Sequence, residues 1–271
     1  MRKSLNDFEI EEVKNQAREK LGICRKSGDV IGTQIFSILS IYARVIYYPL
    51  GESAPWGFTR ISGCRDDASL EKPFVAINTS ISVDCQVFAA AHELYHIWYE
   101  QKPDVLPSDL LNEDDKESNE KRANRFAAEF LMDEVLLSQE INTYKIKTFC
   151  IKEVLQLAQL FVVPYRAMAK RLNEIALIDE RKLDELLDIS EDMIGQYRKR
   201  YAISVPNMEN RILVDNLAEL STTAYEAGLI TYEKLEYQLA ICGLKPEDVG
   251  IEKQSINAFP SDEELDSIME E

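Results

Sequence analysis

Both histidines of this chain lie in one pentapeptide that has the spacing of a metal site. His92 and His96 enclose the segment His92-Glu93-Leu94-Tyr95-His96, and the chain has no other histidine. If this segment is helical, four residues turn the chain through about 400°, so the two imidazoles lie on one face about 40° apart. Zinc binds imidazole nitrogen, and a catalytic zinc site keeps about three protein ligands and one water. The spacing predicts that His92 and His96 hold one ion together.

Glu93 follows the first histidine and has the position of a general base. On a helix it is rotated by about 100° from His92, which is too far for a natural third ligand. From this position its carboxylate can still reach a water at the ion. We therefore expect Glu93 to act on the water rather than on the metal.

The third ligand must come from outside the pentapeptide, and a carboxylate is the best candidate. Glu120 lies three residues before Ala123 and seven before Ala127, so it continues the apolar stripe of a predicted helix. A carboxylate on a buried face is costly unless a cation neutralises it, which favours Glu120 as the ligand. The alternative carboxylates are Glu117 and Glu113.

Two further side chains fall near this predicted site. Asn124 lies one turn after Glu120, where it could accept the second ring N–H of a metal-bound histidine, or could serve only its helix. Cys85 lies two turns before His92 on the same helix face. A buried structural thiol is favoured for Cys85 over a contact with the metal.

The elements that must position these residues indicate a short strand followed by a helix. Phe74-Val75-Ala76-Ile77-Asn78 is the clearest strand, and its edge is expected to hold an extended substrate by main-chain pairing. Ser82 is the expected N-cap of a helix that contains no Gly or Pro as far as Tyr99. Other expected elements are a strand at Ala43–Leu50, a short strand at Gly57–Ser62, and helices at 8–22, from Ile31, at Glu117–Met132 and through most of the chain from Ile151.

Composition places the chain among ordinary globular proteins. Apolar residues make up 45% of the 271 residues and charged residues 29%. The formal charge of −17 makes direct nucleic-acid binding unfavourable. Five scattered cysteines without a CxxC motif are typical of reduced thiols in the cytosol. The first residues lack the apolar segment of a signal peptide, and no stretch has the length of a membrane span, so a cytoplasmic protein without a membrane partner is expected.

The segment INTSISVDCQVFAAAHELYH, followed by ESNEKRANRFAAEFLM, resembles the ImmA/IrrE family of intracellular zinc metallopeptidases. The family has HExxH after a strand and then a helix of the form ExxAN.FAA.LLM. Residue by residue, the resemblance implies one Zn²⁺ held by His92, His96 and Glu120, with Glu93 as general base. It covers about residues 5–180. Because family members typically cleave or antagonise DNA-binding repressors, often on mobile elements, it implies a repressor or similar regulator as protein substrate.

The chain departs from the family pattern at Tyr95, where the family commonly has Gly. A tyrosine there is expected to narrow the cleft or to change the choice of substrate. None of the departures falls on the expected ligands.

The expected fold is α+β, with a zincin-like core and a small sheet followed by a mostly helical part. The predicted domains are a metallopeptidase domain at 1–148, a helix-turn-helix-like segment at 149–180, a helical region at 181–260 and an acidic tail at 261–271. The helix-turn-helix-like segment would present four side chains outward, namely Tyr165, Arg166, Lys170 and Arg171. Because the net charge is negative, we expect this segment to pack on the peptidase domain or to bind a protein rather than DNA.

Two classes of function are compatible with the sequence. The first is a zinc endopeptidase that cleaves a regulator. The second is a non-proteolytic anti-repressor or regulatory binding protein with a structural metal site. Glu93 favours the first, because a purely structural site has no need of a base beside the water.

Overall fold

The computed structural model describes residues 5–60, 72–100, 113–204, 207, 212–214 and 216–252. They fall into two compact units, Met1–Leu213 and Val214–Glu271. The predicted tail at 261–271 lies outside the described residues. The finer domain boundaries expected after residues 148 and 180 stay predictions.

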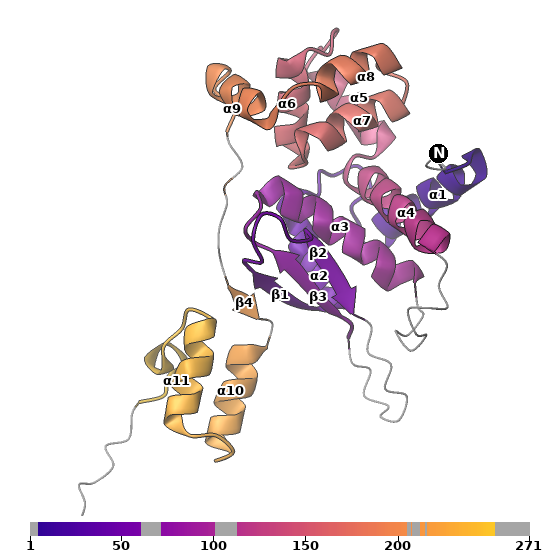
Figure 1. The fold of residues 1–271 in the computed structure, drawn as a ribbon. Coiled ribbons are helices and arrows are strands. Elements are labelled where there is room, and N and C mark those ends of the chain that lie inside the picture. The colour runs from indigo at the N-terminus through magenta and orange to yellow at the C-terminus, as the bar shows by residue number, and fades with distance from the viewer. Residues whose placement is uncertain are drawn as a thin grey trace, which may run out of the picture. The chain divides into compact units, whose positions relative to one another are not determined.

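A small mixed sheet forms the base of the first unit. Its strands are β1 (Arg44–Tyr48), β2 (Gly57–Arg60), β3 (Phe74–Asn78) and β4 (Leu213–Val214), in the order β2-β3-β1-β4 (Figure 1). β3 pairs in parallel with β1 and antiparallel with β2. The main chain of β3 is therefore hydrogen bonded on both sides and has no free edge. The expectation that residues 74–78 pair with a substrate is wrong, and β2 is the end strand beside β3.

Helix α3 (Val83–Tyr99) carries the pentapeptide across the sheet, against β2 and β3 (Figure 1). It begins after Ser82, which has the extended backbone of an N-cap. The Ser82 hydroxyl bonds Asp84 instead of the helix backbone, and Asp84 in turn accepts a hydrogen bond from the backbone N–H of Cys85. A carboxylate in the first turn of α3 also suits the helix dipole.

Helix α4 (Glu113–Leu131) lies against α3 and carries the second half of the predicted site. Its buried face includes Phe126 and Ala127, which pack into the same core as Leu94 of α3. The other side of α4 is covered by α1 (Asp7–Ile23), while α2 (Ile35–Tyr42) and the short helix η1 (Gly32–Gln34) pack beside α3. This packing fixes the two helices that bring the site together.

The rest of the first unit is helical, as predicted from Ile151 onward, and α5 is a further helix that was not predicted. Its elements are α5 (Glu134–Thr143), α6 (Ile151–Phe161), α7 (Tyr165–Glu174), α8 (Glu180–Leu187) and α9 (Glu191–Arg200). The turn between α6 and α7 contains Val162 at φ 53°, in the left-handed region, and Pro164 as the N-cap of α7. Since proline cannot continue a helix but suits its start, the chain makes a sharp corner there.

The sequence predicts that four side chains of α7 point outward, and this prediction is wrong for two of them. Arg171 is buried and binds Glu129 of α4, with Nη1 2.8 Å from Oε1. Tyr165 is also buried, and its hydroxyl donates to the carbonyl of Leu186. Arg166 is half-buried and binds Glu191 and two carbonyl groups, which leaves Lys170 as the exposed member. This arrangement ties α7 to α4, α8 and α9 and removes most of the outward basic face that DNA binding would require.

The second unit contains a helical hairpin. It contains α10 (Leu217–Glu226), α11 (Tyr232–Ile241) and the short helix η2 (Pro246–Val249). Gly228, at φ 70°, allows the chain to turn between α10 and α11. Across the described part of the chain, every helix is too short or too polar to cross a bilayer.

Candidate metal centre

The side chains of His92, His96 and Glu120 converge between α3 and α4. The Nε2 atoms of the two imidazoles are 3.0 Å apart. The Glu120 carboxylate lies 3.2 Å from Nε2 of His92 and 3.8 Å from Nε2 of His96. One ligand atom from each residue lies within 4.8 Å of the other two. Two imidazole nitrogens and a carboxylate at this spacing form a donor set that suits zinc, so the residues present fit the predicted ion.

Glu120 reaches this point from the surface and not from the core. Its side chain is 60% exposed, so the expectation that it shares the buried stripe of its helix is wrong. The buried face of α4 starts one turn later, at Ala123. The hydrogen bond with His92 lowers the pKa of Glu120 despite some desolvation. A charged carboxylate at the open side of the His pair is the form that a metal ion requires.

Hydrogen bonds to the Nδ1 atoms orient both imidazoles. His92 Nδ1 lies 3.1 Å from Oδ1 of Asn124, and His96 Nδ1 lies 2.8 Å from Oε2 of Glu100. Because both partners accept, each Nδ1 donates its N–H, and each Nε2, which faces Glu120, is the ring nitrogen that would bind an ion. Asn124 was expected in this position, whereas Glu100 was not predicted from the sequence. Glu100 lies four residues, or one helical turn, after His96. This is the same spacing as between the two histidines, and it could have predicted the contact.

The Glu100 carboxylate also changes the proton affinity of His96. Burial by itself lowers the pKa of His96, but the hydrogen bond and the negative charge of Glu100 outweigh it and raise the pKa above its usual range. The same two effects increase the basicity of Nε2 on the opposite side of the ring. A more basic nitrogen is a stronger ligand for a divalent cation.

Glu93 lies beside the three converging groups and is held by strand β2. Its side chain is buried, and Oε2 accepts a 2.7 Å hydrogen bond from Oγ1 of Thr59. Desolvation raises the pKa of Glu93, and the Thr59 hydrogen bond partly opposes this shift. β2 passes so close that a Cβ at Gly57 would lie 3.0 Å from Oε1 of Glu93 and 3.2 Å from the carbonyl of Ala76. Gly57 and Thr59 were not identified from the sequence, because only the folded sheet brings them to Glu93.

The matched family agrees with this geometry. Residues 43–173 match the model of a peptidase family described as the IrrE N-terminal-like domain. This match supports membership of the ImmA/IrrE family. The matched range runs from the start of the sheet to the end of α7 and contains all the site residues described above, so a metallopeptidase-type function is supported. No curated protein and no solved structure matches this chain.

The ring of Tyr95, a departure from the ImmA/IrrE pattern, lies edge-on to the ring of His96, with 6.0 Å between the ring centroids. It is buried, and its ring packs 5.5 Å from that of Phe126 and 5.4 Å from that of Tyr99. The expectation that Tyr95 narrows the cleft is therefore wrong, since the side chain belongs to the core between α3 and α4.

We expect Asn124→Ala to weaken zinc binding by about 10–100-fold while the fold is retained. The variant removes the acceptor that holds the His92 ring, so Nε2 is no longer fixed toward Glu120. A chelator-competition titration on the purified protein measures the change. Asn119→Ala is the matched control, since Asn119 is exposed on the same helix. Equal zinc affinities in the two variants would show that Asn124 serves only its helix.

Proposed function

We propose that this ImmA/IrrE protein is a zinc-dependent endopeptidase that cleaves a protein, namely a transcriptional repressor or similar regulator. The observation that carries the proposal is the convergence of His92, His96 and Glu120 beside the buried carboxylate of Glu93. A structural metal site requires only the ligands. A separate carboxylate, desolvated and held by Thr59, is the added feature that hydrolysis requires.

The roles of the side chains follow from this arrangement. His92, His96 and Glu120 would hold the zinc ion, which, when bound, polarises the scissile carbonyl and makes a water acidic enough to react near neutral pH. Glu93 would take the proton from the attacking water and deliver it to the leaving amine. Thr59 keeps Glu93 in place during both transfers, and the raised pKa of Glu93 makes it a better proton acceptor than an exposed carboxylate.

The outer edge of β2, which pairs with no other strand in the described parts of the chain, is the best place for a substrate chain. β2 is at one end of the sheet, and its other edge is paired with β3. Gly57 and Thr59 of this strand contact Glu93, so a peptide paired along the outer edge would pass next to the base. Main-chain pairing accepts a segment within a longer chain, which favours an endopeptidase acting on an exposed loop or linker.

Removal and return of the metal tests the proposal. The zinc-loaded protein is incubated with regulators encoded beside its gene, and new termini are identified by mass spectrometry. We expect one discrete cut in a regulator, loss of the cut after chelation, and recovery when zinc is added in excess over the chelator. Cleavage that persists in metal-free protein, or intact regulators at full zinc occupancy, would contradict the proposal.

A further inference from the structure

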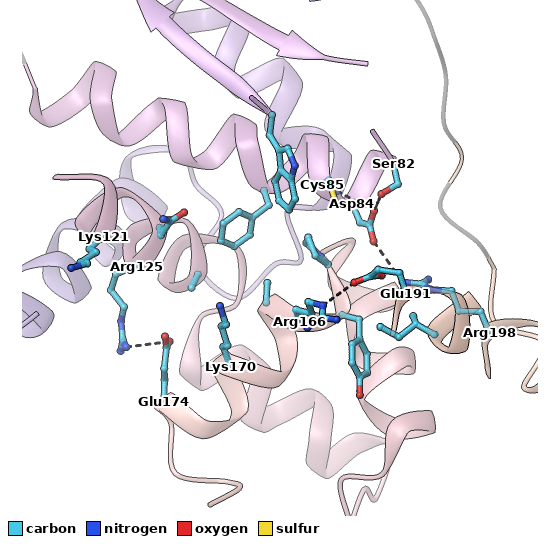
Figure 2. Close-up of a pocket in the computed structure, with 18 of the residues that line it drawn as sticks. Ser82, Asp84, Cys85, Lys121, Arg125, Arg166, Lys170, Glu174, Glu191 and Arg198 are labelled. Carbon is cyan, nitrogen blue, oxygen red and sulfur yellow. Dashed lines mark hydrogen bonds and ion pairs between the residues drawn. The ribbon is translucent and has the colours of Figure 1, made fainter. Parts of the chain in front are cut away.

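A large cleft lies beside the candidate metal centre, between α3 and α4 and the C-terminal helices of the first unit. Its volume is about 990 Å³, and its walls come mainly from α3, α4, α7 and α9 (Figure 2). Phe88 and Cys85 line it from α3, one and two turns before His92. Asn124, which holds the His92 ring, lines it from α4. The cleft therefore lies next to the site where the peptide bond would be cut, and Asn124 belongs to the surroundings of both.

Much of the cleft wall is apolar. Trp56 and Phe88 provide aromatic surface, and Ala128, Ala167 and Ile194 add aliphatic surface. Cys85 belongs to this surface as well, because burial and the neighbouring Asp84 raise the pKa of its thiol to about 12 and keep it neutral. A cleft of this size and character suits a few residues of a peptide that include a large apolar side chain.

The charged groups of the cleft are mostly paired with each other. Arg125 binds Glu174 at 3.1 Å, and Arg166 binds Glu191 at 2.8 Å. Lys170 has no ion pair or hydrogen bond within the described parts of the chain, and its side chain is exposed. Figure 2 shows Lys170 extending from α7 toward the open space between the Arg125–Glu174 and Arg166–Glu191 pairs.

Lys170 thus offers an uncompensated positive charge inside a partly apolar cleft. Of the described side chains that line the cleft, five are basic and three are acidic, although the whole chain carries −17. A carboxylate that enters beside Lys170 gains the modest attraction of a solvent-exposed ion pair. Nucleic acid is a poorer fit, because phosphate backbones require several free cations along a track.

We propose that this cleft binds the substrate segment on one side of the scissile bond and that Lys170 selects an acidic side chain next to a large apolar one. The apolar side chain would lie against Trp56 and Phe88, and the carboxylate would pair with Lys170. This inference rests on the proposed peptidase function and adds a preferred substrate class to it.

Cleavage of a synthetic peptide pool tests the inference. Peptides with randomised central positions are digested by the zinc-loaded wild type and by Lys170→Glu, and the cut sites are read by mass spectrometry. We expect the wild type to enrich Asp or Glu at one position near the cut, with a large apolar residue adjacent. Lys170→Glu should lose this preference by about tenfold and favour Lys or Arg at the same position.

Lys152→Glu is the matched control, because it makes the same charge change on an exposed residue of α6 that does not line the cleft. It should keep the wild-type preference. A wild type that cuts the pool without an acidic preference, or a Lys170→Glu protein that retains it, would overturn the inference and leave the peptidase proposal standing. If the zinc-loaded wild type cuts neither the pool nor any candidate regulator, the peptidase proposal fails and this inference fails with it.

A binding measurement separates selection by Lys170 from an indirect effect on turnover. The most enriched acidic peptide and its amide counterpart, with Gln or Asn in place of the acid, are titrated into the Glu93→Gln protein. We expect about fivefold tighter binding of the acidic peptide, and no difference when Lys170→Glu is added. Equal affinities in the first titration, or displacement of the peptide by a short DNA duplex in a Lys170-dependent manner, would contradict a peptide-selecting cleft.

Discussion

Glu93→Gln should reduce cleavage of the regulator by about 10²–10⁴-fold, the usual contribution of a positioned general base. Glutamine keeps the size of the side chain and can still accept the hydrogen bond from Thr59, so β2 and α3 should pack as before. It has no carboxylate to take a proton from water. Because Glu93 is not one of the three converging ligands, zinc occupancy should be unchanged. Single-turnover rates and metal content, measured on the same preparations, check both parts.

The result also decides between the two classes of function. Glu11→Gln is a suitable control, since Glu11 is exposed on α1 and is not one of the converging ligands. The control should cleave at the wild-type rate. If Glu93→Gln relieves repression in cells as fully as the wild type does, proteolysis is not the function, and a non-proteolytic anti-repressor takes its place.

The sequence predicts the site well where the site is built from helical periodicity. His92, Glu93 and His96 lie in one helix, and Asn124 lies one turn after Glu120 in another, as expected from their spacing. Glu100 follows the same four-residue rule and could have been found in this way. These relationships depend on geometry within a single helix, which the order of residues determines directly.

Other features depend on pairing between distant segments, and the sequence does not reveal them. Residues 74–78 form a strand as predicted, but the order of the sheet places that strand between two others. Thr59 reaches Glu93 from 34 positions away only because β2 pairs with β3. From its residue type, Arg171 is expected at the surface. In the fold, Glu129, 42 positions earlier, provides a buried counter-charge for it. An arginine is rarely buried unless it is paired. Because its partner can lie far away in the sequence, the neighbouring residues do not show that Arg171 is buried.

Removal of the Glu120 carboxylate is the second change with a large expected effect. Structural zinc sites with four protein ligands bind with about 10–16 kcal/mol, so one ligand contributes roughly 3 kcal/mol, or about a hundredfold in affinity. Glu120→Ala should lose zinc by about this factor or more, and cleavage should fall with occupancy. The side chain is 60% exposed, so the metal-free fold should keep its stability within about 0.5 kcal/mol.

Glu117→Ala is the control for this change, because it removes an acid from the same exposed end of α4. Glu117 lies 2.8 Å from the amine of Lys121 and is not part of the converging group, so zinc affinity should be retained. Competition with a chromogenic chelator gives both affinities, and thermal unfolding of the metal-free proteins gives both stabilities. Full zinc occupancy in Glu120→Ala would exclude Glu120 as a ligand. Loss of zinc in Glu117→Ala alone would instead make Glu117, the alternative carboxylate on this helix, the third ligand.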